Sequence, residues 1–197
     1  MSDLQGDRTK TVVINTNQMA WQESPAPGVW RKRLELVGDS DKGMVTSIVR
    51  FDPGCGFPEH GHPLGEEVLV LDGSFEDRYG TCGQGSYTLL PNGSHHAPIS
   101  AQGCTLFVTL CQYAGDGRAE VKIDTAATDS WEQTQPGRRM LALYSDPEHP
   151  ESARLSRLDP GTRVDHHSHD GGAEVFVIAG ELRDENGRYP AGTWMRF

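Results

Sequence analysis

The sequence has little that would suit a membrane or the exterior of a cell. Its 197 residues contain no apolar run near the roughly 18 residues that a membrane span needs. The first ten residues, MSDLQGDRTK, are polar where a signal peptide would be apolar. We therefore expect a cytoplasmic protein, neither secreted nor membrane-bound. The four cysteines form no CxxC pair and are expected to be free thiols, most of them buried.

Positive charge is also scarce, because 18 Lys and Arg residues face 28 Asp and Glu residues, giving a formal charge of −10. A surface this acidic repels the phosphate backbone, so we expect no direct contact with nucleic acid. Long helices are disfavoured as well, since 23 Gly and 12 Pro residues interrupt a chain that is 36% hydrophobic. This composition is typical of short strands joined by tight turns.

What the chain does contain is an internal repeat. The sequence RFDPGCGFPEHGHPLGEEVLVLDG at 50–73 aligns without a gap on RLDPGTRVDHHSHDGGAEVFVIAG at 157–180, at a constant offset of 107. Upstream, WQESPAPG from Trp21 resembles WEQTQPG from Trp131. We predict two copies of one unit, at 20–124 and 125–197, after an N-terminal segment at 1–19. The second copy ends at Phe197, which matches Leu90 of the first, so it is expected to be incomplete.

Both copies are predicted to be almost entirely β-structure. Runs rich in β-branched and apolar residues are broken by Gly, Pro, Asp and Asn clusters at intervals of about 8 to 12 residues. The expected strands lie at 44–51, 66–77, 86–91, 104–111, 153–159 and 173–184. This spacing favours a small barrel or sandwich. The N-terminal run TKTVVINT is a candidate extra strand, for example to complete the sheet of the shorter copy.

A set of histidines and a carboxylate in the first copy is suited to a metal ion. His60 and His62 are separated by one residue, and alternate side chains of a strand share a face. Glu66 follows with the same parity, and the second half of the unit adds His95 and His96. Three imidazoles and one carboxylate are a good ligand set for a divalent transition metal.

The spacing of these residues resembles that of the cupin superfamily, whose two motifs are G-x5-H-x-H-x3-or-4-E-x6-G and G-x5-P-x-G-x2-H. The first motif is matched by Gly54, His60, His62, Glu66 and Gly73, and the second by Gly85, Pro91, Gly93 and His96. The resemblance selects Glu66 over Glu67 and His96 over His95 as ligands, and Glu67 is expected to be an outward-facing charge. It implies an all-β protein of two double-stranded β-helix (cupin jelly-roll) barrels in tandem, the second one incomplete.

The second copy carries a weaker version of the same pattern. His167 and His169 match the first two ligands, but Ala173 stands at the position of the carboxylate. Glu174 aligns with Glu67 and is the nearest substitute. A second metal site made of His167, His169 and Glu174 is therefore a minor expectation, since two histidines alone bind a metal poorly.

Within the cupins, HGHPLGEEVLVLDGSFED, GSYTLLPNGSHH and GCTLFV resemble the ChrR-like group over roughly residues 45–110. ChrR is an anti-sigma factor whose zinc-holding cupin-like domain helps release an extracytoplasmic-function sigma factor during oxidative stress. The resemblance implies zinc, with iron, manganese or nickel as alternatives, and a protein partner in sigma-factor regulation. ChrR binds its sigma factor through a separate helical domain that carries an HxxxCxxC zinc motif. This chain contains no CxxC, so that motif is absent from its sequence.

Three functions remain open at this point. The first is a metal-binding regulator or sensor of the ChrR kind. The second is a non-haem iron dioxygenase that acts on a small diketone or aromatic ketone, since ChrR-like cupins resemble such enzymes. The third is a storage or structural cupin in which the metal only stabilises the fold. No catalytic side chain is assigned, and a small-molecule ligand is compatible with the first two.

A homodimer is the expected assembly. Cupin barrels often pair through sheet edges, and an incomplete second barrel would otherwise expose unpaired strands.

Overall fold

The computed structural model describes residues 3–39, 43–169 and 171–197, and it is built of strands with one short 3₁₀ helix, η1 (Thr16–Gln18). The strands of the first copy are β2 (Gln22–Glu23), β3 (Val29–Val37), β4 (Met44–Phe51), β5 (Cys55–Gly56), β6 (His60–His62), β7 (Glu66–Asp77), β8 (Gly80–Gly83), β9 (Ser86–Leu90), β10 (Ser94–His96), β11 (Ile99–Ser100), β12 (Cys104–Leu110) and β13 (Val121–Asp124). The strands of the second copy are β14 (Glu132–Gln135), β15 (Arg138–Asp146), β16 (His149–Leu158), β17 (Glu174–Phe176), β18 (Glu181–Arg183), β19 (Arg188–Pro190) and β20 (Thr193–Arg196). The described residues include no helix with the length and apolar character that a membrane crossing requires.

The first copy forms a barrel around an apolar interior. Its main sheet runs β13-β9-β7-β12-β4-β3-β2, and β6 pairs with β10 in a separate ribbon. Alternate residues of the long strands point inward, as Val68 and Val70 of β7 and Leu106 and Val108 of β12 do. Phe51 at the end of β4 belongs to the same buried cluster. The strands predicted at 44–51 and 66–77 coincide with β4 and β7.

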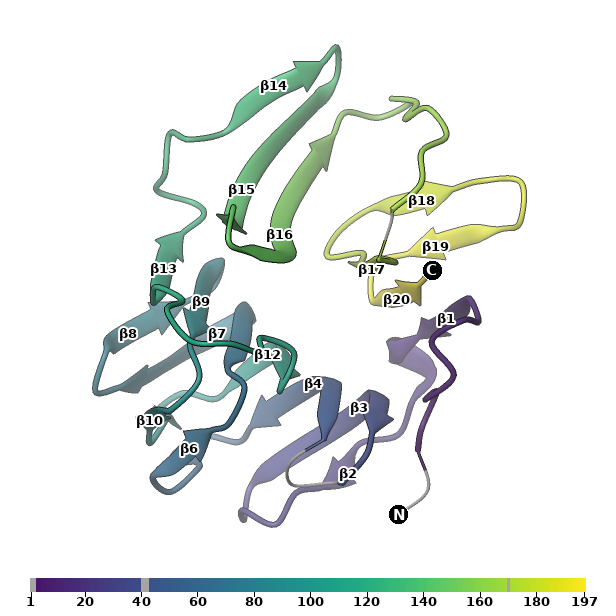
Figure 1. The fold of residues 1–197 in the computed structure, drawn as a ribbon. Coiled ribbons are helices and arrows are strands. Elements are labelled where there is room, and N and C mark those ends of the chain that lie inside the picture. The colour runs from purple at the N-terminus through teal and green to yellow at the C-terminus, as the bar shows by residue number, and fades with distance from the viewer. Residues whose placement is uncertain (1–2, 40–42, 170) are drawn as a thin grey trace.

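The second copy is a smaller set of sheets that lies beside the first (Figure 1). It contains a β14-β15-β16 sheet, a β18-β19 hairpin, and a β1-β20-β17 sheet. The strand β1 (Val12–Asn15) comes from the N-terminal segment and pairs antiparallel with β20, which Figure 1 shows as purple beside yellow. The N-terminal run that we singled out is therefore a strand, and its partner is the last strand of the second copy.

Backbone contacts repeat between the two copies at the offset of the sequence alignment. Gly85 N–H donates to the carbonyl of Val70 at 2.9 Å, and Gly192 N–H donates to that of Val177 at 2.7 Å. The turn glycines Gly73 and Gly180 have φ angles of 71° and 73°, a left-handed conformation that side chains disfavour. These matches confirm a tandem repeat of one all-β unit.

The upstream match is also repeated in three dimensions. The guanidinium of Arg50 lies 4.7 Å from the ring centroid of Trp21, and that of Arg157 lies 4.0 Å from the ring centroid of Trp131. Each pair is a cation–π contact on the outer face of its sheet. The two tryptophans thus share a packing role, which explains the similarity of the segments that carry them.

The predicted strand at 173–184 is divided in the structure, and this prediction was wrong for its central part. The first-copy counterpart β7 is continuous across Gly73 because β12 pairs with it up to Gly73 and β8 pairs with it from Ser74 onward. The described part of the second copy has no strand in the place of β12. Without that partner, the chain forms β17 and β18, and the residues between them belong to no strand.

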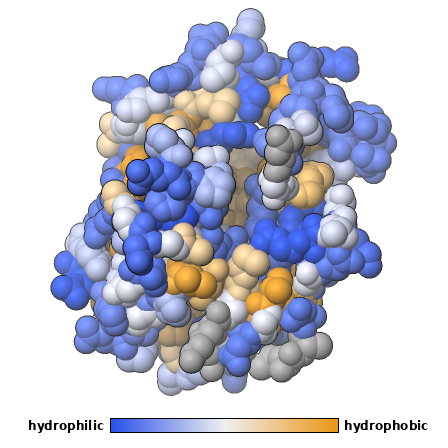
Figure 2. Space-filling model, in the orientation of Figure 1, coloured by the Kyte–Doolittle hydropathy of each residue, from blue (hydrophilic) through white to orange (hydrophobic). Residues whose placement is uncertain are grey.

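The outer face of the first barrel packs against the second copy. Tyr87 and Leu89 of β9 contact a cluster that contains Leu141 and Leu143 of β15. Farther along the sheet, a second cluster joins the outer faces of β3 and β4 to the β1-β20-β17 sheet; it is built around Leu34, Ile48 and Trp194. Figure 2 shows that the face of the molecule seen in Figure 1 is mainly hydrophilic, with small and separate apolar patches.

Arg196 of β20, in the second copy, contacts both the N-terminal segment and the first copy. Its guanidinium forms a buried ion pair with Glu35 of β3 and donates to the backbone carbonyls of Gln5 at 2.7 Å and Asp7 at 2.9 Å. A longer contact of 3.3 Å reaches the carbonyl of Lys10. The Arg196 and Glu35 side chains are 2% and 0% exposed, so this pairing takes place away from water.

Candidate metal centre

Three imidazoles meet at one end of the first barrel because two short strands pair in a particular register. β6 and β10 are antiparallel, with His60 opposite His96 and Gly61 opposite His95. Opposite residues share a face, so His60, His62 and His96 project to the same side while His95 projects to the other. The ring centroids of the three lie 4.7 to 5.0 Å apart, and one ring nitrogen from each lies within 4.8 Å of the others.

Glu66 completes the group from the start of β7. Its Oε2 lies 3.2 Å from Nε2 of His96 and 3.5 Å from Nε2 of His62. Its side chain, like those of His62 and His96, is almost fully buried, whereas His60 is half-buried. The structure thus brings together the four residues that the cupin motifs selected.

The polar atoms at the centre of this group lack hydrogen-bond partners. Nε2 of His62, Nε2 of His96 and Oε2 of Glu66 are all buried without one. Nδ1 of His60 lies 2.8 Å from the carbonyl of Pro58, which leaves Nε2 of that ring as the ligand atom. Buried polar groups in proteins are normally satisfied, so converging orphan atoms of this kind fit a metal ion. The residues present therefore suit the transition metal that the sequence predicts.

The electrostatic environment favours the ligand forms of His62 and Glu66. Burial lowers the pKa of His62 to about 4, which keeps its imidazole neutral near pH 7. Burial opposes protonation of His96, but the nearby Glu66 carboxylate and the hydrogen bond with Asp77 raise its pKa overall, so a metal must displace a proton there. Burial would raise the pKa of Glu66, yet the close contacts with His96 and His62 lower it. The carboxylate is therefore ionised, as metal binding requires.

The loop between His62 and Glu66 is held in an unusual conformation. Leu64 and Gly65 have φ angles of 58° and 80°, and for a leucine this left-handed conformation is strained. The Asn92 side chain accepts from the N–H of Leu64 at 3.0 Å, and the N–H of Tyr113 donates to the carbonyl of Leu64 at 2.9 Å. Asn92 lies in the turn of the second cupin motif, so this turn also fixes the loop that joins two candidate ligands of the first motif.

Glu67 lies on the expected face of its strand but has partners that the sequence did not predict. It points away from the metal group, but it accepts hydrogen bonds from Thr109 at 3.0 Å and from the hydroxyl of Tyr113. Glu67 lies on the expected outer face of the barrel, but it is half-buried because the second copy packs near this face of the sheet. Sequence parity places Glu67 on the correct face but says nothing about what covers that face.

The second-copy residues are not brought together. The rings of His167 and His169 lie 4.9 Å apart and are exposed, and Nδ1 of His167 contacts the carbonyl of Asp165 just as His60 contacts Pro58. Glu174 instead accepts hydrogen bonds from Thr46 and Trp194, each at 3.0 Å. Across residues 3–39, 43–169 and 171–197, the first-copy histidines are the one group close enough to hold an ion. The minor expectation of a second metal site is therefore dropped.

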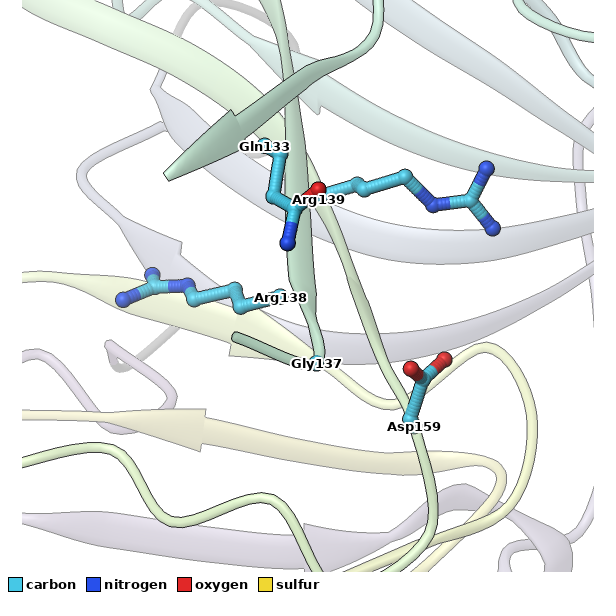
Figure 3. A pocket seen from close by; sticks show the side chains of 5 residues that line it. All are labelled: Gln133, Gly137, Arg138, Arg139 and Asp159. Atoms are coloured by element: carbon cyan, nitrogen blue, oxygen red, sulfur yellow. The ribbon is translucent and has the colours of Figure 1, made fainter. Parts of the chain in front are cut away.

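Two hollows in the surface lie away from this centre. One, of about 150 Å³, is lined in the second copy by Gln133, Gly137, Arg138, Arg139 and Asp159; Figure 3 shows the two arginines extending in opposite directions from their strand. The other, of about 470 Å³, lies on the outer side of the first barrel beside Arg50, Asp52 and Asp72. Neither contains a residue of the histidine group, so neither is a substrate cavity over the metal position.

Comparison with known proteins agrees with the fold and with the repeat. The family model of the ChrR cupin-like domain matches residues 9–114 and 118–196, one segment for each copy. The chain belongs to the ChrR cupin-like domain family. The match includes His60, His62, Glu66 and His96 of the metal group. Among curated proteins, no sequence match was found.

Solved structures similar to this ChrR-like cupin include whole-chain relatives. A provisionally named glyoxylate-induced protein from Pseudomonas aeruginosa is 15% identical, with a TM-score of 0.71 over 95% of this chain and 80% of that one. A provisionally named dioxygenase from Nostoc punctiforme PCC 73102 is 15% identical, with a TM-score of 0.72 over 96% and 75%. The complex of Rhodobacter sphaeroides SigE with the anti-sigma ChrR contains a match at 22% identity, a TM-score of 0.42, and coverage of 49% and 54%. At 15% identity, the two whole-chain likenesses show a shared fold.

Proposed function

We propose that this chain is a metal-binding regulator or sensor of the ChrR kind, whose first barrel holds one divalent transition metal through His60, His62, Glu66 and His96. The observation that carries the proposal is the convergence of three buried, unpartnered ligand atoms on one point. Zinc is the first candidate, since three imidazole nitrogens and one carboxylate oxygen can complete its tetrahedral coordination. A closed site of this kind stabilises or signals rather than catalyses.

Strand β7, which carries the proposed ligand Glu66, is connected by side-chain contacts to the second copy. Glu66 faces the metal position, and Glu67, the next residue of β7, accepts a hydrogen bond from Tyr113 on the opposite face. Arg118 lies 5.5 Å from the ring centroid of Tyr113 and donates to the hydroxyl of Tyr144 in β15 at 2.6 Å. Packed and hydrogen-bonded groups thus connect the strand that carries Glu66 to the contact between the two copies. This continuity supports a sensing role.

The partner of such a regulator is proposed to be a protein of sigma-factor control, as for the family's namesake. The chain has no CxxC of the sort that marks the helical zinc domain of ChrR. We therefore expect weak binding of a sigma factor by this chain alone. An oxidant or a small apolar ligand is the expected signal at the metal site.

A metal-dependent dioxygenase is the second candidate, and one observation favours it. His60 is only half-buried, and its ring lies 5.5 Å from that of Phe57, so one side of the metal position borders an apolar side chain near the surface. An iron ion with open coordination positions there would be accessible to a small ketone.

The metal that the protein carries, and what it does with oxygen, separate the two candidates. Elemental analysis of protein purified without added metal is expected to show zinc near one equivalent per chain. The protein is then loaded anaerobically with Fe(II) and offered β-diketones and hydroxyacetophenones at an oxygen electrode. We expect no uptake above that of free iron. Uptake that depends on the protein and disappears in Glu66→Ala would establish the dioxygenase and refute the regulator.

A two-fold dimer is also proposed, and it makes a separate prediction. The ten-residue strand β16 stands at the edge of its sheet, and within the described residues its only ladder is with β15. An open edge of this length is normally covered in solution. Light scattering at micromolar concentration is expected to report twice the chain mass of 21.6 kDa. A monomer at all concentrations tested would contradict the proposal.

A further inference from the structure

We infer that Asp77 is a positioning residue for the metal centre, which fixes the orientation and the proton of the His96 ring. The inference rests on the proposed metal-binding function and extends it to a residue outside the cupin motifs. Asp77 ends β7 and His96 ends β10, so the fold, and not the local sequence, brings them together.

The contact is short and shielded from water. Oδ2 of Asp77 lies 2.7 Å from Nδ1 of His96, and the two side chains are 5% and 3% exposed. The other oxygen, Oδ1, accepts the backbone N–H of Tyr79 at 2.8 Å. Both carboxylate oxygens of Asp77 therefore have a partner. These two contacts fix the orientation of the carboxylate toward the His96 ring.

The chemistry of this contact decides which nitrogen of His96 is free for a metal. An ionised carboxylate can only accept, so Nδ1 of His96 must carry the proton that it donates. In the neutral ring Nε2 then has its lone pair exposed, and Nε2 is the buried, unpartnered atom 3.2 Å from Oε2 of Glu66. A carboxylate that accepts a hydrogen bond from one nitrogen of a ligating imidazole also makes the other nitrogen more basic, and therefore a stronger metal ligand.

The second copy provides a natural comparison that separates this role from a purely structural one. Asp184 stands at the position equivalent to Asp77 and also accepts the backbone N–H of the residue two places on, Asn186, at 2.7 Å. It is exposed, and its remaining contacts are to Gly187 N–H and the Tyr189 hydroxyl within the same hairpin. Stabilising the hairpin turn is therefore common to both aspartates, whereas the contact with a histidine belongs to Asp77.

The test compares zinc affinity, by chelator competition, in the whole chain and in three variants. Asp77→Ala is expected to weaken zinc binding by about 10- to 100-fold, the range typical of an outer partner of a metal ligand. Asp77→Asn, which keeps one acceptor, is expected to fall between Asp77→Ala and the unchanged protein. Asp184→Ala removes the equivalent turn contact far from the metal and is expected to leave zinc affinity unchanged.

Two further readouts distinguish positioning from folding. The thermal unfolding of the metal-free proteins shows whether Asp77→Ala and Asp184→Ala lose similar stability. The ¹⁵N shifts of the His96 ring in the zinc-loaded protein are expected to show a protonated Nδ1 that exchanges slowly, and faster exchange in Asp77→Ala. If the unchanged protein binds zinc and Asp77→Ala binds it as tightly with the same ring signals, the inference is overturned while the proposed function stands. If the unchanged protein binds no metal, both are overturned.

Discussion

Replacing His96 with alanine is expected to remove nearly all metal from the purified protein, with zinc affinity more than about 100-fold weaker, beyond the range of an outer partner. The imidazole is one of four proposed ligands, and its Nε2 is buried beside Glu66 without another partner. Its removal leaves a three-ligand site whose remaining carboxylate is still buried. The measurement is metal content per chain after dialysis against a weak chelator.

His95→Ala is the matched control for this experiment. His95 is the neighbouring residue of the same strand, but it is exposed and lies opposite Gly61, on the side away from the metal position. Metal content in this variant is expected to equal that of the unchanged protein. Equal losses in the two variants, or no loss in either, would contradict the assignment of His96 as a ligand.

Replacing Arg196 with methionine is expected to lower the free energy of unfolding by about 3 to 5 kcal/mol. The substitution leaves the Glu35 carboxylate buried without its main partner, and it also removes the donors to the carbonyls of Gln5 and Asp7. Arg8, whose Nε lies 3.7 Å from Glu35, offers only partial compensation because it is 40% exposed. Urea unfolding provides the measurement, and faster proteolysis within the N-terminal segment is expected alongside it.

Two variants make this second prediction specific. Arg188→Met removes an exposed ion pair with Glu181 at 3.5 Å and is expected to cost less than about 1 kcal/mol. The double variant Arg196→Met with Glu35→Leu removes both charges and is expected to recover part of the loss, because no uncompensated charge remains buried. A loss below about 1 kcal/mol for Arg196→Met alone would show that this buried pair does not hold the chain ends together.

The four candidate metal ligands could be selected from the sequence because the motifs define them by spacing. His60, His62 and Glu66 lie within one short segment, and the glycines and proline around them mark the turns that bring the segment to His96. β4 and β7 were predictable because each is a run rich in β-branched and apolar residues, part of which, such as Val49 and Val68, packs inside the barrel.

The rest of the site depends on contacts that no local pattern records. Asp77 is 19 residues from His96, and its equivalent Asp184 makes only contacts within its own hairpin, so the sequence around each aspartate predicts the same turn. Glu67 was assigned the correct face of its strand, but the second copy near that face became visible only in the structure. The run at 173–184 has the composition of one strand and is divided because no strand pairs with its centre among the described residues.

X-ray absorption at the edge of the bound metal tests the central claim most directly. The claim is that one transition metal is held in the first barrel by three histidines and Glu66. We predict a first shell of nitrogen and oxygen atoms at about 2.0 to 2.2 Å, with the multiple-scattering signal of about three imidazoles and no sulfur. This signal should be reduced in His62→Ala and unchanged in His167→Ala. A sulfur shell near about 2.3 Å would point to cysteine ligands, and a signal lost in His167→Ala would point to the second copy; either would contradict the account.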